Sequence, residues 1–213
     1  MSDKQKLTLS VLIAALLWLI MFTSWTGGKL NFWLEMSCSA VVLTCLVLAF
    51  TPDRKALFQV EKPLLQLAAG IVIAIALWCV FWVGDKLSSL LFSFARPEVD
   101  AVYAMKTGLP PYAIALLLLL VIGPAEELFW RGYVQRTLGR ILSGKHSANL
   151  AFVLTTLMYA LVHIWSFNFM LIMAALVAGA VWGLLYRLNP KCLPALVVSH
   201  ALWDAMVFVL FPI

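Results

Sequence analysis

Residues 111–132, which read PYAIALLLLLVIGPAEELFWRG, decide the fold. The run up to residue 122 carries no charge, and a helix needs about 20 mostly apolar residues to cross a bilayer. The charges Glu126, Glu127 and Arg131 follow within the same stretch. An ionisable side chain inside a span costs at least about 2.5–3.5 kcal/mol, so it usually pairs or lines a wet functional cavity. The stretch therefore predicts a membrane helix that carries a polar site.

The composition extends this interpretation to the whole chain. Of the 213 residues, 64% are hydrophobic and 12% are charged, whereas a soluble domain carries roughly 25% charged residues. We therefore predict an all-α fold, a polytopic membrane helix bundle of about seven transmembrane helices. The predicted spans are 7–25, 30–50, 64–84, 111–138, 148–165, 169–186 and 193–211. The first is expected to be a retained span, because no Ala-x-Ala cleavage site follows it.

No linker or repeat divides the chain, so we predict one bundle with two parts, 1–108 and 109–213. The first part holds three spans and, within 85–108, a short interfacial helix with leucines at helical spacing that Pro97 ends. In the second part, the pair Gly123-Pro124 should kink the fourth span or begin a new half.

The distribution of basic residues predicts the orientation. Of the 15 Lys and Arg residues, eleven fall on the side of the N-terminus and four on the other side. The positive-inside rule then places the N-terminus inside and the C-terminus outside. The rule also explains the net charge of +5, so we expect no nucleic-acid partner. The four cysteines form no C-x-x-C pair, and no disulfide framework is expected.

Three spans of the second part carry all of its acidic residues, Glu126, Glu127 and Asp204, and two histidines, His163 and His200. Because buried polar groups are costly, we expect these side chains to lie together. A single histidine or Glu–Arg pair in a bundle is usually structural, but a set spread over three spans indicates a site.

Helical spacing separates the roles of the two glutamates. Glu127 and Arg131 are four residues apart and should form an ion pair on one helix face. Glu126 points about 100° away from Glu127, because a helix turns once in 3.6 residues. We therefore expect Glu126 to be free to act as a general base. His200 and Asp204 are also four residues apart and share a face.

Four motifs resemble those of the CPBP family, the CAAX proteases and bacteriocin-processing enzymes, also called the Abi family. They are PAEELFWRG at 124–132, YALVH at 159–163, GAVWGLLY at 179–186 and SHALWD at 199–204. The resemblance covers about 109–209, so we identify 109–213 as a CPBP-like catalytic transmembrane core. Phe is more usual in the family than Tyr159, and Asn is common in place of Asp204.

The resemblance implies an intramembrane endopeptidase of the glutamate type. We expect no cofactor or metal, because Glu127 is committed to Arg131 and Glu126 with one histidine suffices as a base. Carried over to this chain, Glu126 and His163 would activate the attacking water. His200 and Asp204 would stabilise the oxyanion of the tetrahedral intermediate, and Glu127 with Arg131 would support the first helix. The substrate would be a membrane-associated protein or peptide with a prenylated end, a leader or a sorting tail. Membrane lipid is the other expected partner, and the expected location is the cell membrane, in bacteria the inner membrane.

Three other functions stay open at this stage. A zinc peptidase would use His163, His200 and a carboxylate as ligands from separate spans. A transporter or proton relay would use the same ionisable groups, although transporters often show paired broken helices and only one break is present. A non-catalytic immunity or scaffold protein would tolerate the loss of Glu126. The pair Gly179-x-x-x-Gly183 is expected to let helices pack closely, with backbone approach to substrate as the alternative.

Asp204 departs from the common Asn in a way that matters for chemistry, because an ionised carboxylate only accepts hydrogen bonds. Either it stays protonated and donates to the oxyanion, or it ionises and holds His200 as a cation that serves the oxyanion alone. We favour the ion pair.

Overall fold

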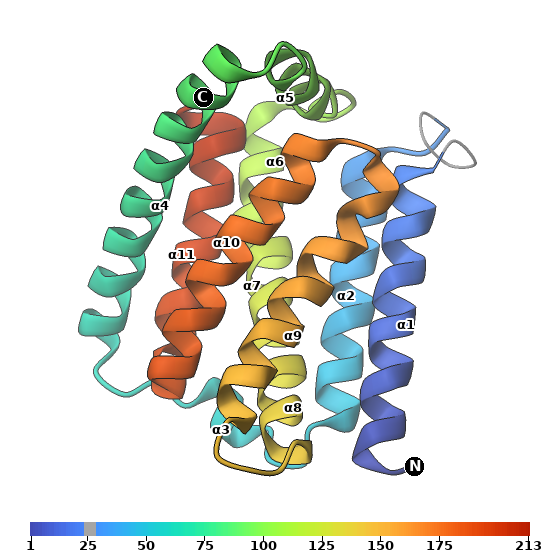
Figure 1. Ribbon diagram of the computed structural model, residues 1–213, viewed down its shortest axis with the longest axis vertical. Helices are drawn as coiled ribbons and strands as arrows, with labels where there is room; N and C mark the ends of the chain where they lie inside the picture. The colour runs from blue at the N-terminus through green and yellow to red at the C-terminus, as the bar shows by residue number, and fades with distance from the viewer. Residues whose placement is uncertain (24–28) are drawn as a thin grey trace.

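A computed structural model describes residues 1–23 and 29–213 and shows a single bundle of helices, 84% helical, with no strand in those ranges (Figure 1). Seven of its helices are long and apolar enough to cross a membrane. They span Asp3–Phe22, Phe32–Phe50, Pro63–Leu91, Pro111–Ile141, Ser147–Ser166, Phe169–Leu188 and Pro190–Leu210. The predicted fold class is confirmed: the chain is an all-α, multi-pass membrane protein. The last residues of the predicted first span, 24 and 25, lie outside the described residues.

The first three spans are α1 (Asp3–Phe22), α2 (Phe32–Phe50) and α4 (Pro63–Leu91), with the short α3 (Lys55–Phe58) between the last two. The fifth span is α9 (Ser147–Leu161), which continues as a 3₁₀ turn, Val162–Ser166. The sixth is α10 (Phe169–Leu188). The seventh begins with a 3₁₀ turn (Pro190–Cys192), continues as α11 (Leu193–Ala205) and ends in a π-helical turn (Met206–Leu210).

The fourth span changes its helical geometry where the sequence predicts a break. Between α6 (Pro111–Leu117) and α8 (Arg136–Ile141) lie two π-helical segments, Leu118–Ile122 and Leu128–Gln135, and between these lies α7 (Gly123–Glu127). The α7 segment begins at the Gly-Pro pair and carries both glutamates. Single π turns occur often at functional sites, and here they flank the two carboxylates.

A short separate helix follows the third span, as expected, but its position was predicted wrongly, and its place at the membrane interface stays a prediction. Leu87, Leu90 and Leu91 belong to the long α4, and the separate helix is α5 (Ala95–Ala104), which contains Pro97. Pro97 is the third residue of α5, where a backbone N–H has no acceptor within the helix, so a proline is tolerated there. The α5 helix lies across one end of the bundle (Figure 1). Its Glu98 carboxylate accepts a hydrogen bond from the backbone N–H of Met170 at 2.8 Å.

The fourth and seventh spans are the most deeply buried, and α4 is the least buried. Gly123 permits their close contact: a Cβ on this residue would lie 2.6 Å from Cα of Ala201. Because Gly123 is one turn before the glutamates and Ala201 follows His200, the missing side chain brings the carboxylates next to the histidine.

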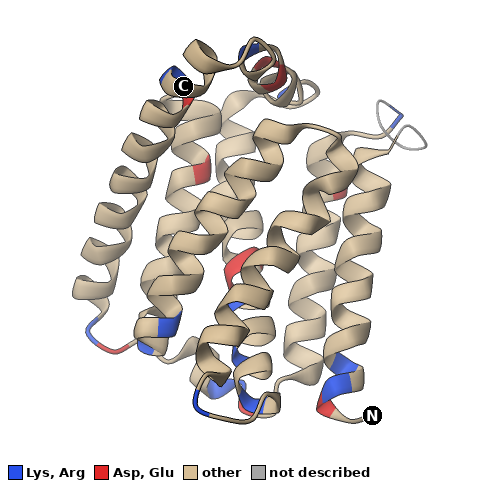
Figure 2. Cartoon of the chain, viewed as in Figure 1, with Lys and Arg blue, Asp and Glu red and all other residues tan. Residues whose placement is uncertain are grey.

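The orientation of the bundle stays a prediction. Lys and Arg gather at the end that carries the N-terminus (Figure 2), whereas Arg131 is 0% exposed and does not count toward either side. Ten basic residues against four still favour an inside N-terminus. Reporter fusions at the two termini should therefore report opposite sides of the membrane, with the N-terminus inside. Both reporters on one side, or an N-terminus outside, would contradict the assignment.

Candidate active site

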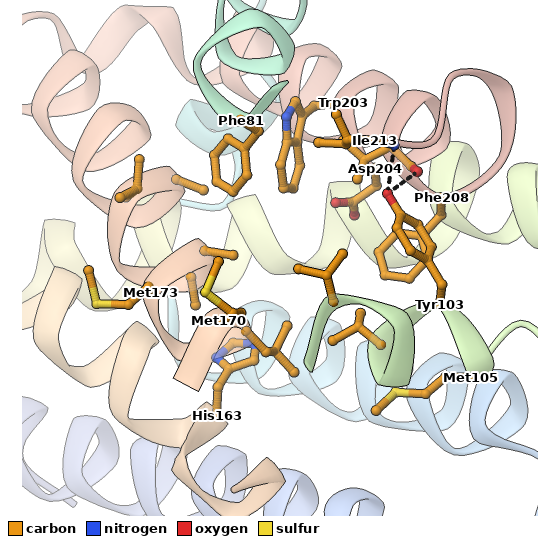
Figure 3. A pocket seen from close by; sticks show the side chains of 18 of the residues that line it. Phe81, Tyr103, Met105, His163, Met170, Met173, Trp203, Asp204, Phe208 and Ile213 are labelled. Carbon is orange, nitrogen blue, oxygen red and sulfur yellow. Dashed lines mark hydrogen bonds between the residues drawn. The ribbon is translucent and has the colours of Figure 1, made fainter. Parts of the chain in front are cut away.

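A cavity of about 420 Å³ inside the bundle collects the polar residues that the sequence singled out. Glu126, His163, His200 and Asp204 all line it, although they come from three different spans. Figure 3 shows His163 and Asp204 facing the same space, among apolar side chains such as Phe81 and Met173. Glu127 and Arg131 do not line this cavity. Four of the predicted site residues therefore line the cavity and two do not, and Glu126 and Glu127 face different ways, as their spacing predicted.

Glu127 lies at the centre of a buried charged cluster. Its Oε1 accepts a hydrogen bond from Nη1 of Arg131, and Nδ1 of His200 lies 2.8 Å from the same oxygen. The predicted Glu127–Arg131 ion pair is present, and both side chains are 0% exposed. Sequence reasoning missed the contact with His200, because it joins two spans that are 73 residues apart. An ionised carboxylate only accepts hydrogen bonds, so Nδ1 of His200 carries a proton in this arrangement.

Groups from two other helices also contact the Arg131 guanidinium. Its Nη2 donates to the carbonyl oxygen of Gly179 at 3.2 Å, and its guanidinium carbon lies 4.9 Å from the ring centre of Tyr159 and 5.4 Å from that of Trp182. A Cβ on Gly179 would meet Tyr159 at 2.8 Å. Gly179 therefore permits close helix packing, as expected, and its buried carbonyl contributes to fixing Arg131.

Neighbouring side chains fix the plane of the His200 ring. Its ring stacks on Trp182 with centres 4.0 Å apart, and Nε2 lies 3.5 Å from Oδ2 of Asp204. Trp182 is fixed in turn, because its Nε1 donates to Oγ of Ser199 at 3.1 Å. Trp182 and Ser199 stand inside the quoted motifs, but neither was predicted to support the site. The only sequence signal for them was their position within those motifs.

The Glu126 carboxylate has one oxygen without a partner, although the Tyr159 side chain interacts with this carboxylate. Glu126 is 3% exposed, it lines the cavity, and its Oε2 has no hydrogen-bond partner among the described residues. It forms no ion pair with Arg131, which is committed to Glu127. A buried acceptor without a partner is costly, and a bound water or substrate N–H can satisfy it.

His163 is held in one tautomer by two neighbours. Its Nδ1 lies 2.8 Å from the carbonyl oxygen of Tyr159, which can only accept, so Nδ1 is protonated. Its Nε2 accepts a hydrogen bond from Nε1 of Trp18 at 3.2 Å. The partner Trp18 lies on α1, 145 residues away, in a part of the chain that carries no motif. No sequence pattern indicates this contact.

The Trp18 indole is expected to act as a positioning residue for His163. Trp18→Phe keeps an aromatic ring against His163 but removes the N–H donor, a change worth about 0.5–1.5 kcal/mol. We expect a roughly 2- to 10-fold lower cleavage rate with little change in thermal stability. Because His163 would accept a proton more readily without this donor, the acid side of the rate profile should move to higher pH.

The control is Trp78→Phe, since Nε1 of Trp78 donates to the carbonyl oxygen of Phe211 and Trp78 does not line the cavity. An unchanged pH profile in Trp18→Phe, or the same change in both variants, would remove Trp18 from the site.

The placement of the His, Cys, Asp and Glu side chains determines whether the site could hold a metal ion. Among the described residues, no group of three or more His, Cys, Asp and Glu side chains is placed to hold a metal ion. Both ring nitrogens of His163 are already engaged, and Nδ1 of His200 faces Glu127. These residues, as arranged here, do not form a ligand set for the zinc alternative.

The part of the chain that carries the predicted site residues matches a model of a known protein family. Residues 107–206 match a family model described as Rce1-like, type II CAAX prenyl endopeptidase. This segment is similar to that family. It is just under half of the 213 residues and contains all six site residues predicted from the motifs. No curated protein and no solved structure matches the chain.

The Rce1-like match confirms the resemblance to the CAAX proteases that the four motifs indicated. This family is one of proteases, which hydrolyse peptide bonds. The match does not reach α1 to α5, so Trp18 and the α5 helix lie outside the matched segment.

Proposed function

We propose that the protein is an intramembrane endopeptidase in which Glu126 activates a water molecule for attack on a peptide bond. The observation that carries the proposal is a cavity between the helices, to which the Rce1-like segment contributes a buried carboxylate oxygen without a partner and two oriented histidines. Glu126 takes a proton from the water as the water oxygen bonds to the carbonyl carbon and a tetrahedral intermediate forms. Glu126 then gives this proton to the peptide nitrogen as the C–N bond breaks, which releases the amine and restores the Glu126 carboxylate.

His163 would assist at the attacking water. With Nδ1 protonated, its Nε2 is the acceptor, and this atom faces Trp18. A water that shares Nε2 with the indole, or replaces the indole there, would be oriented by His163 and deprotonated by Glu126. Trp18 thereby controls how strongly His163 engages the water.

His200 would stabilise the oxyanion. Its Nδ1 is committed to Glu127, so only Nε2 can donate to a developing negative charge, and for that the ring must be doubly protonated. The carboxylates of Glu127 and Asp204 lie on either side of the ring and favour this cation. A charged donor aimed at the oxyanion contributes more than a neutral one.

The proposed substrate class and partners rest on the position and lining of the cavity. The cavity lies within the membrane-spanning helices and is lined mainly by apolar side chains, which suits a substrate segment that is itself membrane-associated. A prenylated C-terminus, a leader or a sorting tail is therefore the proposed substrate class, with membrane lipid as the surrounding partner. The cell membrane, in bacteria the inner membrane, is the proposed location.

The proposal is tested by comparing the membrane proteomes of cells that carry wild type or Glu126→Ala. A substrate should persist uncut only with the variant, and the purified wild type should cut it. Identical proteomes, together with no cleavage of any membrane peptide in vitro, would favour a non-catalytic immunity or scaffold protein. About one equivalent of zinc whose removal and return switches activity off and on would favour the zinc peptidase.

Asp204→Asn distinguishes the two charge states proposed for this residue. If Asp204 ionises and helps to hold His200 as a cation, removing its charge makes the cation deprotonate at lower pH. The alkaline side of the rate profile should then shift down by about one unit, which corresponds to ~1.36 kcal/mol of lost interaction. His200 keeps Glu127 at 2.8 Å, so activity at lower pH should survive. Full activity with an unchanged profile would instead support a protonated Asp204 that donates directly.

A further inference from the structure

A second cavity, of about 440 Å³, lies between the helix ends near the N-terminal end of the bundle. It is distinct from the candidate active site, with which it shares no lining residue. Its walls come from α3 and the loop after it, α8, α9, the end of α10 and the start of α11. Its charged lining is basic, apart from Glu61, and consists of Arg136, Arg140, Arg187 and Lys191.

The charges in this cavity are not balanced by the protein. Lys191 pairs with Glu61 at 2.9 Å, and Arg140 lies 3.9 Å from Asp3. Arg136 and Arg187 have no carboxylate within ion-pair distance among the described residues, and both are half-buried. The cavity therefore holds two partly desolvated guanidinium groups without a counterion.

The other lining residues are held in place by a hydrogen bond between helices and by burial. Gln135 is buried and its Nε2 donates to the carbonyl oxygen of Gly183 at 2.8 Å, which joins the fourth span to α10. Tyr186 is buried against the same wall, one residue before Arg187, and Leu57, Ala151 and Leu193 supply apolar surface. A polar and basic region next to an apolar one suits a ligand with an anionic head and a hydrocarbon part.

The position in the bundle fits a lipid headgroup. The cavity lies where α10 ends at Leu188, α8 ends at Ile141 and the seventh span begins at Pro190, which is the depth of the headgroup region for helices that span a bilayer. Guanidinium groups bind phosphate oxygens in a planar, two-point manner. Basic pockets between transmembrane helices are known to bind anionic lipid headgroups.

We propose that this cavity binds the phosphate of an anionic phospholipid headgroup through Arg136 and Arg187. The site is independent of the peptidase assignment and would exist whether or not Glu126 is a base. Arg136 directly follows Gln135, which is tied to α10, and Arg187 is on α10 itself. A phosphate bound by both side chains would link the fourth and sixth spans and stabilise the fold.

The test uses the full chain in nanodiscs of phosphatidylcholine, with or without phosphatidylglycerol. Native mass spectrometry titrates bound phosphatidylglycerol, and thermal unfolding reports stability. We expect the anionic lipid to raise the Tm of wild type, and Arg136→Gln/Arg187→Gln to weaken lipid binding about 10- to 30-fold, because each basic residue near a membrane surface contributes about 1 kcal/mol. The matched control is Lys4→Gln/Lys145→Gln, which removes two charges from the same end outside the cavity.

Equal loss of binding in both double variants, or no preference for the anionic lipid, would overturn the proposal. A third arm adds inorganic phosphate to protein in neutral lipid: stabilisation by phosphate that the arginine variant lacks, without lipid retention, would assign the site to free phosphate. If the double variant does not fold in neutral lipid, Arg187→Gln alone is measured by the same criteria, since among the described residues the Arg187 side chain hydrogen-bonds only to Asn149.

Discussion

Glu126→Gln should lower the rate of peptide cleavage by about 10²- to 10⁴-fold, the usual contribution of a general base. The amide has nearly the shape of the carboxylate but cannot take a proton from water. Glu126 forms no ion pair and its Oε2 has no partner, so the change breaks no ionic contact in the core. The fold should therefore survive, and the variant should still bind substrate.

The measurement is cleavage of a fluorescent membrane peptide by purified wild type and variant in the same detergent, with thermal unfolding of both. Phe129→Leu, a conservative change in the next helical turn, controls for general sensitivity of this helix, because Phe129 is buried and does not line the cavity. Near-normal turnover in Glu126→Gln would show that another group removes the proton.

Arg131→Ala should lower the free energy of unfolding by about 3–5 kcal/mol, the cost of leaving one member of a buried ion pair without the other. Arg131 is 0% exposed, pairs with Glu127, and joins the fourth span to the carbonyl of Gly179. Its loss leaves the Glu127 carboxylate with His200 as its only cationic partner among the described residues. The main effect should be on stability, measured by thermal or denaturant unfolding.

Glu127 should behave differently from Arg131, although they form one pair. Its Oε1 also contacts Nδ1 of His200, so Glu127→Gln should lower both stability and activity. The expectation from spacing alone, that Glu127 mainly supports the helix, is extended by this contact. If Arg131→Ala unfolds at the wild-type temperature, or if Glu127→Gln retains full activity per folded molecule, the buried cluster does not have these roles.

The sequence alone predicted the properties that depend on local pattern. Seven long apolar runs require seven membrane helices, because a bilayer leaves no other way to satisfy the backbone in each run. Spacing of four residues put Glu127 with Arg131 and His200 with Asp204, since such positions share a helix face. Four motifs in order indicated the family, and the cost of burying charge predicted that the ionisable residues of three spans share one site.

Tertiary structure decided everything that depends on how separate helices face one another. Trp18 on α1 fixes His163 on the fifth span. His200 on α11 and Arg131 on the fourth span both contact Oε1 of Glu127. The spacing of residues within one helix predicts neither contact, because each is made by two helices whose relative rotation and depth follow from packing. The residues at which α4 ends and α5 begins could not be predicted from the sequence either, since leucines at helical spacing suit a lipid-facing span as well as an interfacial helix. Local apolarity and helical periodicity therefore determined the spans and the chemistry available, whereas packing between helices determined which atoms meet.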